Sequence, residues 1–336
     1  MCSNSVLSQF NIVCIGAGTG QSSILSALKG RCNSLSAIVA VTDNGGHSGH
    51  LRKIHKIPQV GDARKCLTAL SGNVTLQSLF DFRYPNGHHR AGVSIGNLLL
   101  AKDTRKSGLG EALRNWGERM RCSGKVFPAT EENTEIVAKT QNGCITGEWE
   151  IISRNPVMPI EHLSLSHDAI AYPPAVQAIL DADVIIISPG SLHTGIISAL
   201  LPKGIAEAIQ KSLAPLIMVC NIMQQPGLTD GWDVSRHVSE IHRYCGRVPN
   251  CVIVNNESLP ADILHLYESL GSQPVPLNQD DETYYLPYPL VPNPIDATVS
   301  RSGRYIQWPH VLTHCPKKLP AALSLAVSNL QASIAL

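Results

Sequence analysis

Glycine-rich loops after apolar runs hold the residues best suited to bind an anion. The first apolar run ends in Gly16-Ala17-Gly18-Thr19-Gly20 and passes directly into a helical pattern. Glycines let a ligand approach the backbone closely, and the free N–H groups at a helix start attract phosphate. The spacing is GxGxG, whereas the dinucleotide fingerprint needs its last glycine where Gln21 stands. We predict phosphate binding here; a tight strand–helix turn without a ligand is the alternative.

The loop after the second apolar run combines an acid with basic groups. Asp43 stands at the end of that run, where dinucleotide-binding proteins hold a ribose hydroxyl. The chain continues as Asn44-Gly45-Gly46-His47-Ser48-Gly49 and then reaches Arg52 and Lys53. We predict that this stretch forms an anion or metal–phosphate loop instead of entering a helix. A structural glycine loop is the alternative.

Further polar loops stand at the starts of predicted helices. Asp62 can cap a helix, bind Mg²⁺ or accept a proton, and Arg64 can bind phosphate through two N–H groups. Asn97 follows a predicted Ser94 cap, and Gly190-Ser191 follows the most apolar run. Ligands of open α/β sheets bind outside the carboxyl ends of the strands. We therefore expect these loops to form one nucleotide-sized site.

Five continuous apolar and β-branched runs predict strands buried on both faces, because neither face of such a strand meets water. The runs are 10–15, 37–42, 183–188, 216–220 and 251–254. Helical patterns follow most of them, at 21–29, 196–210, 234–244 and 261–270. Repeated βα units predict an α/β fold with a doubly wound, mostly parallel, Rossmann-like sheet. We treat residues 1–336 as a single domain of this kind.

A long excursion separates the second and third predicted strands. Its periodicity predicts helices at 62–70, 95–106 and 109–121. The stretches VFPAT, TEIVAKT and CITGEWEI then look like short strands, which predicts a small β-rich insertion over 124–165. Near the end of the chain, the proline-dense stretch 274–294 predicts an ordered extended segment or linker, and 319–330 predicts a closing helix.

The composition argues against several classes of protein. The 27 basic and 26 acidic residues give a net charge of +1, so bulk charge does not favour nucleic-acid binding. No apolar run approaches the ~20 residues that span a bilayer, and the first residues lack the basic region of a signal peptide. Ten cysteines without a CxxC pair are typical of buried thiols in a reducing compartment. We expect a cytoplasmic protein without membrane insertion, and homo-oligomer formation stays open.

Other catalytic motifs fit this chain poorly. The neighbouring His47, His50 and His55 lack the acidic partner of an HExxH zinc site. Gly190-Ser191 lacks the GxSxG elbow of serine hydrolases, and no GxxxxGK[ST] motif is present. An NAD-dependent dehydrogenase is an alternative that the glycine spacing disfavours.

Taken together, the loops resemble a known family. The stretches GAGTG, TDNGGHSGHLRK, IPQVGDARKCLTAL, GVSIGNLLL, GKVFPAT, SPGSLHTGIISALLPKG and MVCNIMQQPGLTDG are similar to those of the YvcK-type gluconeogenesis factors. That family is the bacterial branch of the CofD superfamily, which includes 2-phospho-L-lactate transferase. The similarity extends from about residue 10 to about residue 256, and it implies a Rossmann-like core.

The resemblance implies a nucleotide and phosphate site built from the loops already described. Its implied members are Gly16, Gly18, Thr19, Gly20, Asp43, Gly45, Gly46, Ser48, Gly49, Arg52, Asp62, Arg64, Asn97, Gly190, Ser191 and Asn221. Asp43 would also be a metal ligand, and Asp43 and Asp62 are the candidate catalytic groups of a transferase. The family commonly has DDGG where this chain has Asp43-Asn44-Gly45-Gly46, so one carboxylate that could bind a metal is missing.

Two functions follow from the resemblance. The first is a cytoplasmic regulatory protein that binds a UDP-activated sugar and is linked to gluconeogenic growth and cell shape. The second is a CofD-like transferase, which would use Mg²⁺ to move a phospholactyl-type group from a nucleoside diphosphate donor to an alcohol. In both, the expected partner is a nucleotide or nucleotide-sugar and not a nucleic acid.

Overall fold

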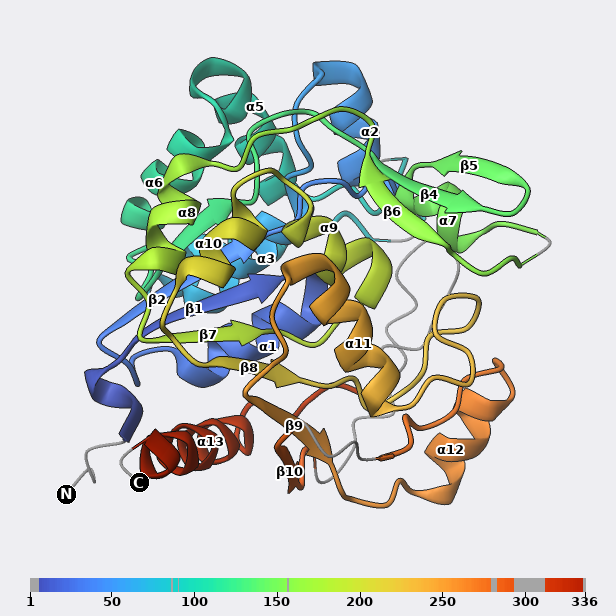
Figure 1. The fold of residues 1–336 in the computed structure, drawn as a ribbon. Helices are drawn as coiled ribbons and strands as arrows, with labels where there is room; N and C mark the ends of the chain where they lie inside the picture. Colours follow the sequence, from blue (N-terminus) through green and yellow to red (C-terminus); the bar gives the residue numbers. More distant parts are fainter. Residues whose placement is uncertain are drawn as a thin grey trace.

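A seven-stranded parallel sheet forms the centre of the computed structural model, which describes residues 6–85, 87–89, 91–155, 157–278, 283–292 and 312–334. The strand order is β10-β9-β8-β7-β1-β2-β3 (Figure 1). The strands are β1 Asn11–Gly16, β2 Ser34–Val39, β3 Lys125–Pro128, β7 Val184–Ile187, β8 Leu216–Val219, β9 Cys251–Asn255 and β10 Tyr285–Tyr288. From β1 the chain builds outwards in one direction to β3 and later in the other direction to β10, so the order reverses between β1 and β7. The predicted doubly wound, parallel sheet is confirmed.

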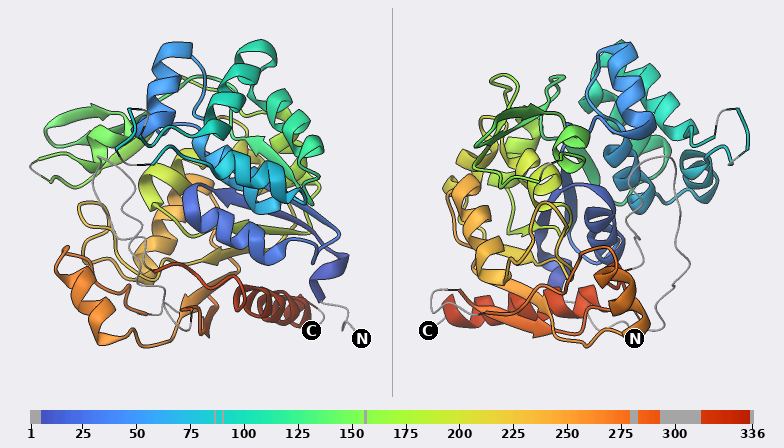
Figure 2. Two further views of the ribbon diagram at one scale, coloured as in Figure 1. Left: turned by 180° about the vertical axis from the view of Figure 1, so that it is seen from behind. Right: turned by 90° about the vertical axis from the view of Figure 1, so that its right-hand side faces the viewer.

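Helices cover both faces of this sheet. One face packs against α1 (Gly18–Leu28), α3 (Gly61–Leu70) and α13 (Leu319–Ile334), and α1 and α13 lie in front of the sheet in the left view of Figure 2. The other face packs against α8 (Pro173–Leu180), α10 (Ile205–Lys211) and α11 (Val234–Cys245). Because both faces are covered, the central strands are mostly apolar and buried, as the sequence predicts.

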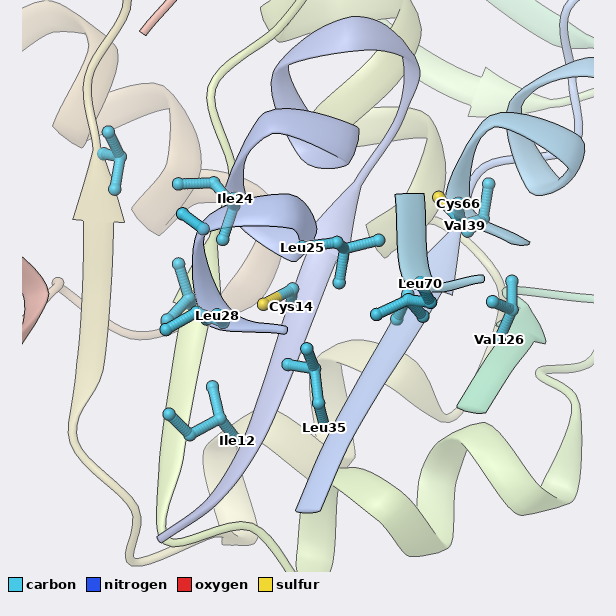
Figure 3. Packing of buried hydrophobic residues seen from close by; sticks show 14 of the residues in the cluster. Ile12, Cys14, Ile24, Leu25, Leu28, Leu35, Val39, Cys66, Leu70 and Val126 are labelled. Atoms are coloured by element: carbon cyan, nitrogen blue, oxygen red, sulfur yellow. The ribbon is translucent and has the colours of Figure 1, made fainter. Parts of the chain in front are cut away.

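The core beneath α1 shows how this packing follows from the sequence. Ile24 and Leu28, four residues apart on α1, lie over Ile12 and Leu35 of β1 and β2 (Figure 3). Cys14 lies in the same cluster as a fully buried free thiol. Burial raises the pKa of this thiol well above its ordinary value, so it acts here as a small apolar side chain.

The remaining helices lie on the excursion between β2 and β3 and near the end of the chain. They are α2 Gly46–His55, α4 Val74–Asp81, α5 Ile95–Ser107, α6 Leu109–Arg119 and α12 Ala261–Glu268. The predicted cap of α5 is confirmed, because the Ser94 hydroxyl accepts the Asn97 N–H at 3.3 Å. The prediction that the chain avoids a helix after the second strand was wrong. Gly45 adopts an extended conformation and α2 begins at the next residue.

The β-rich insertion is a separate three-stranded antiparallel sheet, which lies beside the main sheet in Figure 1. Its strands are β4 Ile136–Thr140, β5 Gly143–Thr146 and β6 His162–Leu165. The stretch VFPAT is not part of it, because β3 pairs with β2 at the edge of the main sheet. The stretch CITGEWEI divides into β5 and a short helix, α7 (Glu148–Ile152).

Two other predicted segments differ in detail. The helix expected over 196–210 is a π-helix, Leu192–Ile197, followed by α9 (Ser198–Leu200) and α10, with the interruption at Pro202-Lys203-Gly204. Within the proline-dense stretch, β10 pairs with β9 at the sheet edge, where a proline is tolerated. Residues 279–282 and 293–294 of that stretch lie outside the described residues. No helix in the described ranges is long and apolar enough to cross a membrane.

Candidate functional site

A cavity of about 440 Å³ opens at the carboxyl edge of the main sheet. Loops that follow β1, β2, β7 and β8 contribute to its walls, together with α7 of the insertion. Its lining includes Gly18, Thr19, Gly20, Asp43, Asp62, Lys65, Glu148, Trp149, Gly190, Ser191, Thr194, Asn221, Met223, Tyr267, Leu312 and His314. The cavity therefore lies at the reversal of strand order between β1 and β7, where open α/β sheets bind ligands.

Two glycine loops meet at the cavity. Gly20, in the first turn of α1, approaches the loop after β7 so closely that a Cβ atom there would lie 1.9 Å from the Pro189 carbonyl oxygen. That second loop is held by Asn221, which accepts the Gly190 N–H at 2.9 Å and donates to the Gly190 carbonyl at 2.7 Å. The cap residue of α1, Ala17, has no side chain that could bond the first N–H groups of the helix. This arrangement leaves backbone N–H groups at the cavity for an anion.

Three acids and one lysine also line the cavity. Asp62 forms an ion pair with Lys65 at 2.9 Å, and Glu148 accepts a hydrogen bond from the Thr194 hydroxyl at 2.9 Å. Asp43 accepts the Gly45 N–H at 2.7 Å. Of the described residues that line the cavity, Lys65 is the single Lys or Arg.

The acids of this group oppose one another's ionisation. Burial, followed by the charge of Asp62, raises the pKa of Asp43. Burial, followed by the charges of Asp43 and Asp62, raises the pKa of Glu148 well above its ordinary value. The neighbouring Asp62 raises the pKa of Lys65, which stays charged. A group of ionisable side chains with shifted pKa values in one cavity is typical of a functional site.

The raised pKa of Glu148 predicts a pH-dependent stability. Its ionisation is harder in the folded protein than in the unfolded chain, so the free energy of unfolding should fall as pH rises from the ordinary carboxyl range through the raised pKa. Glu148→Gln should remove part of this decrease and stabilise the protein by roughly 1 kcal/mol at about pH 8, with little effect at about pH 4. Urea unfolding across this pH range measures the effect. The exposed Glu118→Gln is the control, and equal pH profiles for all three proteins would contradict the prediction.

The structure brings together half of the residues that the sequence predicts for the site. Gly18, Thr19, Gly20, Asp43, Asp62, Gly190, Ser191 and Asn221 line the cavity. The other half do not line it: Gly16, Gly45, Gly46, Ser48, Gly49, Arg52, Arg64 and Asn97. Of these, Gly16 ends β1, and Gly49 lets α2 approach the Asn44 carbonyl, since a Cβ there would lie 1.9 Å from that oxygen. Their predicted contribution to binding is therefore at most indirect in this geometry.

The two arginines predicted to bind phosphate instead bond to the protein. Arg52 donates to the Asn133 side chain at 2.7 Å and to the Thr42 carbonyl at 3.0 Å. Arg64 donates to the Phe80 carbonyl at 3.1 Å and to Asp81 at 2.6 Å. Both residues are only 4% exposed, so neither guanidinium reaches the cavity, and their positions do not support the predicted phosphate contacts.

Two other predicted polar residues also serve the protein itself. Asn97 is fully buried and donates to the Ser48 hydroxyl at 3.1 Å, which joins α5 to α2. Asp62 is the second residue of α3 and not its cap, because Val60 occupies the cap position. The Asp62 carboxylate is therefore available to Lys65 and to the cavity.

Sequence reasoning missed several residues of the cavity. Lys65 stands one residue after the predicted Arg64, and helical geometry turns it towards Asp62 three residues before it. The sequence pattern predicts a strand at Glu148 and Trp149, whereas the structure has a helix that begins after Gly147. Tyr267, Leu312 and His314 lie beyond residue 256, after the last motif recognised in the sequence, although the family model itself extends to residue 286.

The carboxylates of the cavity do not form a metal site by themselves. Among the residues with described positions, no three His, Cys, Asp or Glu side chains are grouped closely enough to hold a metal ion. Mg²⁺ is usually held by one or two carboxylates together with phosphate oxygens of a ligand. The mutual repulsion of Asp43, Asp62 and Glu148 fits such a cation, which would offset it.

The fold and the cavity define a Rossmann-like α/β protein with a glycine-lined cavity at the topological switch point. A family model described as 2-phospho-L-lactate transferase CofD matches residues 12–286. A Bacillus subtilis protein named gluconeogenesis factor is 36% identical over 270 residues, which cover 79% of this chain and 84% of that protein. The chain therefore belongs to the CofD family, among the YvcK-type gluconeogenesis factors.

Two further comparisons describe the extent of the similarity. A Deinococcus radiodurans relative is 36% identical over 264 residues, and this chain spans 56% of that protein's length. A crystal structure of a Bacillus halodurans protein of the UPF0052 family has a TM-score of 0.84 and 32% identity, and the match covers 94% of this chain and 99% of that one. The overall fold is therefore that of a solved family member.

Proposed function

We propose that the protein is a regulatory protein that binds a nucleotide-sugar, with a UDP-linked sugar as the expected ligand. The observation that carries the proposal is the meeting of the Gly18–Gly20 and Gly190–Ser191 loops at the switch point of the sheet. Backbone N–H groups at such a place bind phosphates without a cluster of arginines. This matches a cavity in which Lys65 is the single Lys or Arg among the described lining residues.

The cavity lining includes two kinds of side chain that suit the two parts of a nucleotide-sugar. Asp43, Asp62 and Glu148 lie close enough to shift one another's ionisation, and carboxylates accept hydrogen bonds from sugar hydroxyls. Met223 and Leu312 pack against the apolar cluster around Tyr267 and offer apolar surface to a flat base. In this proposal the diphosphate lies beside the glycine loops.

His314 adds a further polar group to the cavity lining. Its Nε2 lies 2.9 Å from the Cys220 carbonyl and donates to it, and burial lowers the pKa of the imidazole to about 4. The ring is therefore neutral at physiological pH, and its Nδ1 is an acceptor. Such an acceptor suits an N–H group on the edge of a base such as uracil.

Mg²⁺ is part of the proposal as a companion of the diphosphate. Asp43 and Asp62 are the residues that would hold it, because their oxygens are hard ligands and the two carboxylates are close enough for the charge of Asp62 to raise the pKa of Asp43. When bound, the ion would neutralise charge on the phosphates. Asn44 offers no carboxylate to the ion, and its side-chain amide is already bonded to α7 of the insertion.

The biological role that we propose is the one expected for the family, a link between carbon metabolism and cell shape in the cytoplasm. A phospho-group transferase of the CofD type is the second candidate. The perturbed carboxyl groups of Asp43 and Glu148 favour it, because catalytic groups often have such pKa values. In that case Asp43 or Asp62 would assist transfer from a nucleoside diphosphate donor to an alcohol.

Calorimetric titration with UDP-N-acetylglucosamine, GDP and NAD, each with and without Mg²⁺, tests these functions. We expect UDP-N-acetylglucosamine to bind with a roughly micromolar Kd and without turnover. Asp43→Asn should weaken this binding by about tenfold, which corresponds to about 1.4 kcal/mol. The exposed Asp168→Asn is the matched control. Metal-dependent release of a nucleoside monophosphate would favour the transferase, and tight binding of NAD alone would overturn both proposals.

A further inference from the structure

Asn44 joins the loop after β2 to the small helix α7 of the insertion. Its side-chain oxygen accepts the Trp149 N–H at 2.9 Å, and its side-chain nitrogen donates to the Glu150 carboxylate at 2.7 Å. The cap residue of α7, Gly147, has no side chain to satisfy the first N–H groups. Asn44, more than one hundred residues earlier in the chain, therefore takes the place of a cap.

The surroundings are shaped to admit this amide. Gly147 has a φ of +104°, and a Cβ atom on it would lie 2.2 Å from Glu150 Oε2 and 2.3 Å from Asn44 Nδ2. A side chain at this position would therefore meet the Asn44–Glu150 hydrogen bond directly. The absence of a side chain at position 147 keeps space for that bond as well as permitting the backbone conformation.

α7 forms one wall of the cavity. Glu148, Trp149 and Ile152 line it, and the Thr194 hydroxyl donates to Glu148 at 2.9 Å. At the other end of α7, Arg154 donates to the Ile151 and Met158 carbonyls and to the Gly227 carbonyl of the loop after β8. The helix is thus tied to the main sheet near both ends, and Asn44 provides the tie at its start.

We propose that Asn44 is a positioning residue, which holds α7 and the Glu148 carboxylate at the cavity and thereby sets the affinity of the site. The chemistry requires an amide. Its oxygen accepts from a backbone N–H while its nitrogen donates to a carboxylate, and an aspartate at this position would accept the first bond but face Glu150 as a second negative charge. Residue 44 acts through α7 and not as a metal ligand. The part that concerns affinity rests on the proposed nucleotide-sugar function.

Three variants test the proposal: Asn44→Asp, Glu150→Gln and the double variant. In Asn44→Asp we expect hydrogen exchange at the Trp149 amide to rise by about tenfold or more and the affinity for UDP-N-acetylglucosamine to fall by a similar factor. Glu150→Gln alone should change the exchange rate at Trp149 and the affinity by less than about threefold each, because a glutamine amide can still bond to Asn44. The double variant should return the exchange rate and the affinity to near their wild-type values. The introduced glutamine can donate to the introduced aspartate, so the hydrogen bond between residues 44 and 150 forms again with donor and acceptor exchanged.

The outcomes separate this proposal from the proposed function. Unchanged exchange at Trp149 in Asn44→Asp, or no recovery in the double variant, overturns the role of Asn44 as a tie. Raised exchange with unchanged affinity overturns its role in setting the site. If the wild-type protein binds no nucleotide-sugar, the proposed function fails, whereas the exchange experiment still decides whether Asn44 holds α7.

Discussion

Gly20→Ala is expected to abolish binding of the nucleotide-sugar and to lower the free energy of unfolding by at least about 2 kcal/mol. The new methyl group would lie 1.9 Å from the Pro189 carbonyl oxygen and 2.6 Å from the carbonyl carbon. Both are backbone atoms of the loop after β7, so no side-chain rotation relieves the overlap. The two loops must separate, and they are the same loops that we propose to bind the diphosphate.

Gly18→Ala is the matched control on the same turn. A Cβ atom there meets nothing within 4 Å, but the residue has a φ of +65°. Gly18→Ala should lower the free energy of unfolding only through backbone strain, by about 1 kcal/mol, and the two glycine loops should stay in contact. Urea unfolding and calorimetric titration of both variants measure the difference. Equal losses of stability and affinity in the two variants would show that loop contact is not the important feature.

Arg52→Met is expected to lower the free energy of unfolding by about 3 kcal/mol while leaving the affinity for UDP-N-acetylglucosamine within about twofold. Arg52 bonds to the Thr42 and Thr134 carbonyls and to the Asn133 side chain, and it lies 3.7 Å from Glu135. Methionine would remove the donor from the two buried carbonyl oxygens, those of Thr42 and Thr134. The effect is on folding because the guanidinium joins the end of β2 to the segment that enters the insertion.

Lys53→Met provides the control for Arg52→Met, since Lys53 is the next residue on α2 and is exposed. Lys53→Met should change neither the free energy of unfolding nor the affinity for UDP-N-acetylglucosamine measurably. Arg52→Lys should recover only part of the stability, because one ammonium cannot match the three-way geometry of the guanidinium. A loss of affinity of tenfold or more in a folded Arg52→Met protein would restore Arg52 to the phosphate site and contradict this interpretation.

The sheet was predictable because its strands are buried on both faces. The run Val184–Ile187 is fully buried, and every residue in it is Val or Ile. Such a run excludes an amphipathic element, and the helical patterns that follow require parallel pairing. The boundary of the insertion was less predictable. β3 pairs with β2 in the main sheet and does not belong to the insertion. Local sequence does not reveal this pairing, because β2 lies about ninety residues earlier in the chain.

Part of the site was also predictable, for a related reason. Glycine loops after parallel strands must meet at the carboxyl edge of the sheet, so Gly20, Asp43 and Gly190 could be assigned to one cavity from local spacing. α2 was not predicted, because the glycines at its start and in its first turn disfavour an isolated helix. Burial of Leu51 and Arg52 against the rest of the protein overrides that propensity.

The amino-acid sequence by itself determined the class of fold, the family and the edge of the sheet at which a ligand can bind. Only the tertiary structure decided which polar groups line the cavity at that edge. Arg52 and Lys65 are both cations beside glycine-rich helix starts, yet the first is enclosed by carbonyls and the second lies in the cavity next to Asp62. The position of Glu148 also depends on the tertiary structure. It lies in an insertion more than eighty residues after Asp62, and the fold brings both residues to the same cavity. Local sequence determines periodicity and turns, whereas the direction and partners of a polar side chain depend on distant segments that the sheet brings together.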